Sequence, residues 1–250
     1  MTLAILSALP EEQQGIAELL DDAHTHQHAG RRFVSGRWHG QSVVLALSGI
    51  GKVAAATTTA VLIERFAVQQ LVFTGVAGGV GEGVAVGDVV VAQQLLQHDV
   101  DVRPLFARWL VPGYAQPDWI CDARLSQALL QAAQATTEAA RSWEVPLLQG
   151  RTPQAHVGLI VSGDQFIVSA NTAQAMAQDL QQARYMPLAV EMECAAVAQV
   201  CADYGVPLAA VRTISDRADE QAHIDFPAFI RTVASRYALH MLENWVRGLP

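Results

Sequence analysis

The run Leu71-Val72-Phe73-Thr74-Gly75-Val76-Ala77-Gly78-Gly79 joins an apolar strand to the small residues that follow it. Its apolar, partly β-branched start is typical of a strand inside a sheet, and its glycines mark the strand's end. Short apolar strands of this kind alternate along the chain with longer segments rich in Ala, Leu and Gln, which are typical of helices. The alternation predicts an α/β fold built around a mixed sheet.

The same alternation predicts strands and helices over the whole sequence. Strands are expected at 3–9, 32–38, 41–47, 71–75, 86–94, 157–162, 189–191 and 208–215. The second and third flank His39-Gly40 and alternate apolar with polar residues, which predicts an antiparallel pair. Helices are expected at about 11–22, 52–66, 124–138, 173–183, 193–204 and 227–246. No linker, repeat or low-complexity tract divides the sequence, so we expect a single domain over residues 1–250.

The composition excludes several classes of protein. Of the 250 residues, 51% are hydrophobic and 16% are charged, which is too apolar for a disordered chain and too irregular for a coiled coil. Acidic residues outnumber basic ones by 24 to 16, and Lys52 is the only lysine. So few cations cannot cover a phosphate backbone, and we therefore expect no nucleic-acid partner.

The cysteines and the N-terminus indicate where the protein works. Cys121, Cys194 and Cys201 form no CxxC pair, and the last two lie seven apart in an apolar helical stretch, which predicts buried free thiols. Residues 1–9 are apolar but lack a basic start, so we expect no signal peptide, and no apolar run is long enough to cross a membrane. These features predict a cytoplasmic location and no membrane partner.

Residues 103–121 differ from the rest of the chain. This segment contains three prolines and four aromatic residues with little periodicity. A long aromatic loop in a compact domain is usually a lid, a binding loop or a subunit contact, and a loop packed on its own side chains is the simpler alternative. The residues alone do not distinguish a functional loop from a loop packed on its own side chains.

Polar and glycine residues gather where the predicted strands end, which is the edge at which α/β sheets bind ligands. The stretches concerned are 8–12, 48–51, 74–79, 162–167, 190–193 and 213–216. None has the GxGxxG spacing of a dinucleotide site or the GxxxxGK[ST] pattern of a phosphate loop. The glycines therefore predict either tight turns or a backbone that a flat ligand approaches closely.

Three acids at separate strand ends, Glu12, Glu193 and Asp216, indicate acid–base chemistry on an organic bond. No Cys/His cluster accompanies them, so we expect no metal. Asp216 follows an apolar run, where a carboxylate is either paired with Arg212 or tuned for proton transfer. Glu193 has a simpler alternative, because an acid at a helix N-terminus commonly just offsets the helix dipole.

The motifs SGIGKV (48–53), TGVAGG (74–79), GDVVV (87–91), SGDQFI (162–167), VEME (190–193) and VRTISD (211–216) occur in one order and spacing. In these the chain resembles the 5′-methylthioadenosine/S-adenosylhomocysteine nucleosidases of the purine nucleoside phosphorylase superfamily, over residues 1 to about 230. The resemblance implies a three-layer αβα fold with a central mixed sheet, no cofactor, and a homodimer. It also implies hydrolysis of the N-glycosidic bond of these adenine nucleosides, and of 5′-deoxyadenosine, within methionine salvage.

The resemblance implies a role for each matching residue. Asp216 would give a proton to purine N7 as the base leaves, and Glu12 would activate the attacking water. Met192 and Glu193 would hold the ribose hydroxyls, with Glu193 favouring the positive charge that grows on the sugar. The base and sugar contacts would come from Phe166, the backbone of Ile167, Ala77 and Gly78, and the residues further around the nucleoside would be Ile50, Glu191, Ser215 and Phe226.

The chain departs from the family pattern in places. Val76 stands where the family usually has Ser, which removes one hydroxyl contact, and Leu9 replaces the usual Met. The region 103–158 is longer and more divergent than in the family, where it helps to close the pocket for the 5′ group, often across a dimer.

Three alternatives compete with this hypothesis. A phosphorylase shares the fold, but phosphate would be repelled by the loop that carries Glu11 and Glu12, so water is the better nucleophile. A nucleosidase for AMP or for an aminofutalosine would use the same groups. A non-catalytic nucleoside-binding protein would be expected to lack Glu12 or Asp216, and both are present.

Overall fold

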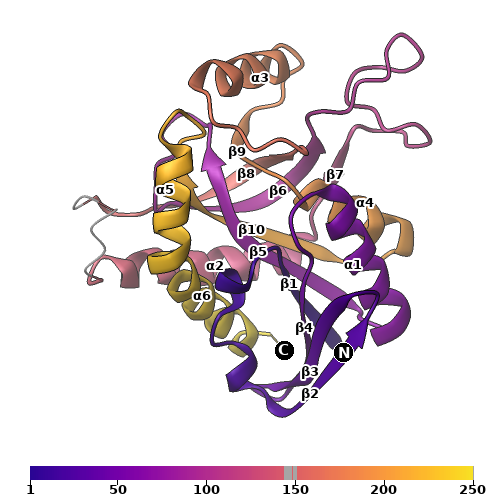
Figure 1. The fold of residues 1–250 in the computed structure, drawn as a ribbon, viewed down its shortest axis with the longest axis vertical. Helices are drawn as coiled ribbons and strands as arrows, with labels where there is room; N and C mark the ends of the chain where they lie inside the picture. The colour runs from indigo at the N-terminus through magenta and orange to yellow at the C-terminus, as the bar shows by residue number, and fades with distance from the viewer. Residues whose placement is uncertain (144–147, 149–150, 250) are drawn as a thin grey trace.

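The computed structural model of the chain describes residues 1–143, 148 and 151–249, which form a ten-stranded mixed sheet with helices on both sides (Figure 1). The strands are β1 Thr2–Ser7, β2 Asp21–His28, β3 Arg31–Trp38, β4 Gln41–Leu47, β5 Gln70–Gly79, β6 Val89–Gln97, β7 Asp118–Ile120, β8 Ala155–Ser162, β9 Pro187–Glu191 and β10 Leu208–Asp216. The helices are α1 Lys52–Phe66, α2 Ala123–Ala140, α3 Ala170–Gln182, α4 Cys194–Tyr204, α5 Ala222–Phe229 and α6 Ser235–Arg247. Shorter helical turns lie at Pro10–Gln13, Ala17–Leu19 and Ile230–Ala234.

The strand order brings several carboxyl ends to one edge. The sheet runs β10-β6-β8-β9-β5-β1-β4-β3-β2, with β7 paired to β6. β10 also pairs with β5, so the strands from β10 to β5 close into a ring and the others extend from it as an open sheet. β1 is parallel to both β4 and β5, and β5 is parallel to β10, so these four strands end at the same edge.

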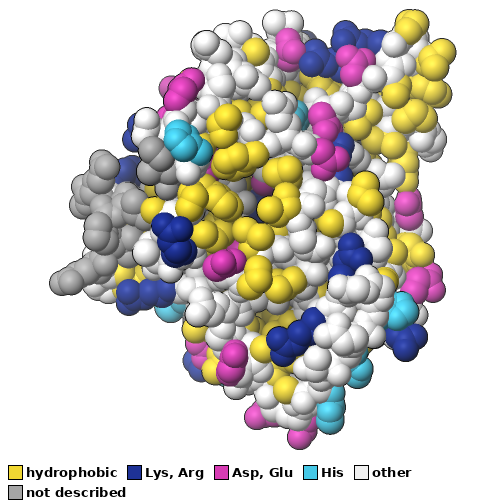
Figure 2. Space-filling model, in the orientation of Figure 1, with side chains coloured by type: hydrophobic (Ala, Val, Ile, Leu, Met, Phe, Trp, Pro, Cys, Tyr) yellow, Lys and Arg dark blue, Asp and Glu magenta, His cyan; other side chains and the backbone are white. Residues whose placement is uncertain are grey.

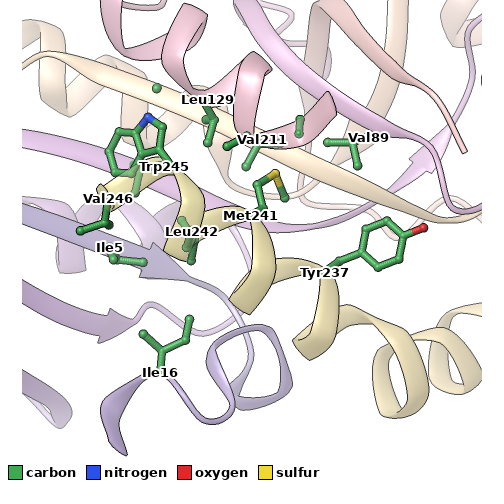
Figure 3. Close-up of a cluster of buried hydrophobic side chains, with 14 of the residues drawn as sticks. Ile5, Ile16, Val89, Leu129, Val211, Tyr237, Met241, Leu242, Trp245 and Val246 are labelled. Carbon is green, nitrogen blue, oxygen red and sulfur yellow. The ribbon is translucent and has the colours of Figure 1, made fainter. Parts of the chain in front are cut away.

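Side chains alternate along β1 and enter two separate cores. Leu3 and Ile5 face α2 and α6, and Figure 3 shows Ile5 with Trp245 of α6 in this cluster. Ala4 and Leu6 point to the other face and pack with α1 and α4. A strand that is apolar on both faces needs cover on both faces, so the sheet is the middle layer of three, as expected.

Most of the elements predicted from the sequence are confirmed. The antiparallel pair is β3 and β4, and the helices expected at 52–66, 124–138, 173–183 and 193–204 are α1 to α4 with small shifts at their ends. The strand expected at 86–94 begins later, at Val89, because Gly87 at φ 89° and Asp88 form a turn in which Asp88 accepts a hydrogen bond from the backbone of Ala85.

The helix predicted at 11–22 is wrong. That stretch contains two short helical turns and the start of β2, with Gly15 between the turns at φ 84°. Seven of the eight residues of β2 are exposed and the eighth is half-buried, so the strand carries no apolar alternation that could reveal it. The helix expected at 227–246 begins earlier, at Ala222, and Pro227 lies inside its second turn rather than at its start.

The segment 103–121 packs partly on its own chain. Trp109 and Trp119 are buried, and Tyr114 contacts Trp119 edge to face and donates a hydrogen bond to Asp203. The short strand β7, which the sequence did not predict, lies within this segment. Leu105, between β6 and β7, is 81% exposed. The chain between these two strands forms loops that extend from the body of the molecule (Figure 1).

The three cysteines are free and buried, as the sequence predicted. Among the residues that the structure describes, no helix is long and apolar enough to cross a bilayer.

Candidate active site

A cavity of about 320 Å³ opens at the carboxyl edge of the sheet, where Figure 2 shows hydrophobic side chains around a hollow near the middle of one face. Its wall is mostly apolar, and its polar side chains are four acids and a serine. It brings together most of the predicted site residues: Glu12, Ile50, Ala77, Gly78, Phe166, Glu191, Met192, Glu193, Ser215, Asp216 and Phe226. Ile167 lines an adjoining hollow that shares Phe166 and Met192 with the cavity.

Glu12 lies in the short turn that follows β1, and its carboxylate closes that turn. Oε2 accepts hydrogen bonds from the backbone N–H groups of Ala8 (2.8 Å) and Leu9 (2.9 Å), and Oε1 accepts one from Val76 (3.0 Å). Burial raises the pKa of Glu12 above its ordinary value, although Arg212 and the backbone N–H groups act to lower it. A carboxylate shifted in this direction is a better proton acceptor near neutral pH than a free glutamate.

Arg212 is a buried cation whose place in the site the sequence did not reveal. Its Nη2 lies 2.6 Å from Glu191 Oε2, and its guanidinium group lies over the ring of Phe73, 4.2 Å from the centroid. Its Nη1 has no hydrogen-bond partner among the described residues. A Cβ on Gly75 would lie 2.7 Å from that Nη1 and 2.6 Å from Glu12 Oε1, so only glycine leaves room for both groups. The free N–H group beside the Glu12 carboxylate is suited to hold an oxygen atom of a ligand or water.

Glu191 and Glu193 lie at the junction of β9 and α4, and their carboxylates differ in how they are held. Glu191 accepts hydrogen bonds from Ser162 Oγ, from Arg212 and from the first N–H groups of α4, which occupy both oxygens. Burial would raise the pKa of Glu191, but Arg212 and these hydrogen bonds hold it below its ordinary value. Glu193 accepts a hydrogen bond from the backbone of Gly51 (2.7 Å), and burial together with Glu191 raises its pKa to about 8.

Asp216 ends β10 with a carboxyl group held by two donors. Oδ1 accepts a hydrogen bond from the backbone of Ala218 (2.9 Å), and Oδ2 accepts one from Ser215 Oγ (2.8 Å). Burial raises the pKa of Asp216 above its ordinary value, although both hydrogen bonds act to lower it. The alternative that Asp216 pairs with Arg212 is wrong, because Arg212 points to Glu191. The shift toward the protonated form is the one that a proton donor requires.

Aromatic and aliphatic side chains form the rim of the cavity. The rings of Phe166 and Phe226 meet edge to face with their centroids 5.6 Å apart. Phe166 is 43% exposed and Ile50 is 56% exposed, although both are large and apolar. An apolar rim above a set of convergent acids is suited to a ligand with one flat aromatic part and one hydroxylated part.

The family model described as the phosphorylase superfamily matches residues 2–244, nearly the whole chain. The chain belongs to this superfamily. Its mixed α/β architecture is the one that the resemblance implied, and solved structures with the same fold confirm it.

Relatives within the superfamily are similar over their full length. The chain is 33% identical to a 5′-methylthioadenosine/S-adenosylhomocysteine nucleosidase of Oceanobacillus iheyensis, with all of both chains covered. It superimposes with a TM-score of 0.85 and 34% identity on the nucleosidase of that name from Neisseria meningitidis in complex with methylthio-immucillin-A, with 99% of each chain covered. A futalosine hydrolase of Helicobacter pylori is also similar, with a TM-score of 0.84 and 31% identity over all of this chain and 98% of that one.

The two histidines that precede loops in the sequence, His98 and His223, do not line the cavity. His98 borders a different hollow, beside Trp109 and α3, and His223 is exposed at the start of α5. An arginine inside an apolar strand was the signal that could have found Arg212, because a buried guanidinium requires an anionic partner. The identity of the acid that pairs with Arg212 depends on the order of the strands in the sheet, which the sequence did not show.

Proposed function

We propose that the chain hydrolyses the N-glycosidic bond of 5′-methylthioadenosine and S-adenosylhomocysteine and releases adenine. The observation that carries this proposal is the pair of buried carboxyl groups, Glu12 and Asp216, in one apolar cavity with the pKa of each raised. The names of the full-length relatives support the choice of substrate. 5′-Deoxyadenosine, which ends in a plain methyl group, is included as a further substrate.

The proposed first step breaks the bond between C1′ and the base. Asp216, in its protonated form, donates its proton to N7, and the electron pair of the C–N bond leaves with adenine. The base would lie against Phe166, with the backbone of Ile167 and the loop at Ala77 and Gly78 at its edges. Positive charge then develops on the sugar, and the charged form of Glu193, which predominates above about pH 8, stabilises it.

The proposed second step adds water. Glu12 takes one proton from a water molecule while the oxygen of that water attacks C1′. The free Nη1 of Arg212, beside Glu12, can orient the water. Met192 and Glu193 hold the ribose hydroxyls so that the sugar keeps its position between acid and base. Glu191, whose oxygens are occupied, acts on the site by fixing Arg212 rather than by binding the sugar itself.

We also propose an oligomeric state, a cellular location, a domain organisation and a pathway for this chain. A homodimer that uses the loops of 103–121 is proposed from the exposure of Leu105 and Phe106. The buried free cysteines favour a reducing cytoplasmic location. One sheet that contains both β1 and β10 supports a single domain over residues 1–250. Hydrolysis of 5′-methylthioadenosine and S-adenosylhomocysteine would place the enzyme in methionine salvage.

A second substrate class is supported by the futalosine hydrolase among the similar structures. The test is incubation of the purified protein with methylthioadenosine, adenosylhomocysteine, aminofutalosine, adenosine, inosine and AMP, with and without phosphate, followed by chromatography of the free base. Phosphate-independent adenine release from the thio-substituted nucleosides is the expected result. Release that requires phosphate and forms ribose 1-phosphates would establish a phosphorylase instead, and release from aminofutalosine alone would establish the second class.

A further inference from the structure

Lys52, the only lysine of the chain, begins α1 directly after the loop that follows β4. Its Nζ lies 2.6 Å from Asp99 Oδ1 and donates a hydrogen bond to Gln97 Oε1 at 3.1 Å. Asp99 follows the end of β6. The side chain therefore joins the end of one strand to the start of a helix that follows another.

The network closes through a third loop. Asp164, which follows β8, donates its backbone N–H to Asp99 Oδ2 at 2.9 Å. Its own Oδ1 accepts a hydrogen bond from the backbone N–H of Lys52 at 2.8 Å. Lys52, Asp99 and Asp164 thus form a closed ring of contacts, called here the Lys52 ring, that ties together the loops after β4, β6 and β8.

The Asp99 carboxylate is held in its charged form. Burial alone would raise the pKa of Asp99, but the hydrogen bonds from Lys52 and from the backbone of Asp164 hold it below its ordinary value. Lys52 and Asp99 are only 17% and 32% exposed, so solvent screens this ion pair less than a pair on an open surface. The Lys52 side chain is therefore confined to one position.

The Lys52 ring is connected to the candidate active site through two loops. Phe166 and Ile167, which line the cavity and its adjoining hollow, follow Asp164 by two and three residues. On the other side, Gly51 donates its backbone N–H to Glu193 at 2.7 Å. Gly51 has φ 97°, and a Cβ there would lie 3.2 Å from Asp164 Oδ1, so the turn and the ring fit closely.

We propose that Lys52 is a positioning residue for nucleoside binding: through Asp99 and Asp164 it fixes the loop of Phe166 and Ile167 relative to Gly51 and Glu193. The inference rests on the proposed function, because the groups it positions are those assigned to base and ribose. Lys52 touches no substrate in this arrangement, and it sets the distance between the base-binding and ribose-binding sides. A purely structural ion pair would change stability and leave substrate affinity as it is.

The test is the steady-state kinetics of Lys52→Met with methylthioadenosine, beside thermal unfolding of the same preparation. KM is expected to rise about tenfold while kcat falls less than threefold, because the ring acts on ground-state contacts and neither Glu12 nor Asp216 belongs to it. Lys52→Arg keeps a charged donor and is expected to restore most of the affinity. Asp99→Asn, which breaks the ring at its second member, is expected to raise KM in the same direction.

Arg247→Met is the matched control, because Arg247 forms an ion pair of the same 2.6 Å length with Glu243 on α6. It is expected to leave KM unchanged. An unchanged KM in both Lys52→Met and Asp99→Asn, with a lowered melting temperature, overturns the inference. If Lys52→Met does not fold, Asp99→Asn decides by the same criterion. A wild-type protein that releases no adenine contradicts the proposed function instead, and calorimetric titration of adenine into the same variants then tests the positioning role by itself.

Discussion

Arg212 Nη2 and Glu191 Oε2 lie 2.6 Å apart, and both side chains are almost fully buried. Removing either partner leaves a charge that water cannot reach, which costs far more than the loss of a surface ion pair. The pair also positions groups of the site. Arg212 presents Nη1 beside Glu12, and Glu191 accepts hydrogen bonds from the start of α4. Stability and function therefore depend on the same contact.

Arg212→Met should lower the free energy of unfolding by about 3–5 kcal/mol, because Glu191 is left buried and unpaired. Urea denaturation of wild type and variant measures this difference. Arg65→Met, at an exposed position near the end of α1, is the control and should change stability by less than about 0.5 kcal/mol. A loss below about 1 kcal/mol in Arg212→Met would contradict the assignment of a buried, mutually dependent pair.

Asp216→Asn should lower kcat by about 10² or more and leave KM and the melting temperature close to those of wild type. The amide keeps the shape of the carboxyl group but cannot transfer a proton to the leaving base. Because Asp216 has no contact with Arg212, its replacement leaves no buried cation unpaired. Both quantities are measured on one preparation, and near-wild-type kcat would remove Asp216 from the role of proton donor.

Leu105→Glu should weaken self-association, since this exposed leucine lies on the loops proposed to contact a second copy. Sedimentation velocity at micromolar concentration is expected to show a dimer for wild type and a larger monomer fraction for the variant. Leu19→Glu introduces the same charge at another exposed leucine and should leave the dimer intact. A wild-type monomer with full activity would end the dimer proposal.

The sequence predicted those parts of the fold in which local pattern and burial agree. Helix α2 is amphipathic, and Asp122 just before it accepts a hydrogen bond from the backbone of Leu125 as an N-cap, so its start and its length could be inferred. Strand β2 could not, because its polar residues follow no period and only its pairing with β3 makes it a strand.

The candidate site was predictable to the extent that it consists of strand ends. Glu12 and Asp216 lie together because β1 and β10 both run parallel to β5 and end at one edge of the sheet. Glu193 reaches the same cavity from β9, which pairs antiparallel with the end of β5. The partner of Arg212 was not predictable, because β10 adjoins β5 and β6 while Glu191 ends β9, and this order is not written in any one segment. The resemblance to a family supplied the individual roles, which residue spacing alone left open.

Glu193 provides a pH test of the same site. Its folded-state pKa of about 8 lies above the ordinary value of 4.5, because burial and Glu191 disfavour its charged form. The folded protein therefore holds this proton more tightly than the unfolded chain does. The stability linked to it is complete below about pH 4.5 and is lost as the pH rises through about 8.

Glu193→Gln should remove this loss, because the amide keeps an acceptor for the Gly51 N–H but carries no charge. The melting temperature of the variant should exceed that of wild type at pH 8.5, and the difference should vanish near pH 4.5. At pH 8.5, where the wild-type carboxyl is largely charged, kcat of the variant should be about 10² lower, since an amide cannot offset the positive charge on the sugar, and this difference should shrink as the pH falls toward 4.5. Glu82→Gln, at an exposed position, is the control and should show neither effect. A melting-temperature difference that stays constant with pH would mean that Glu193 titrates alike in both states, and its burial would then not be the cause of its chemistry.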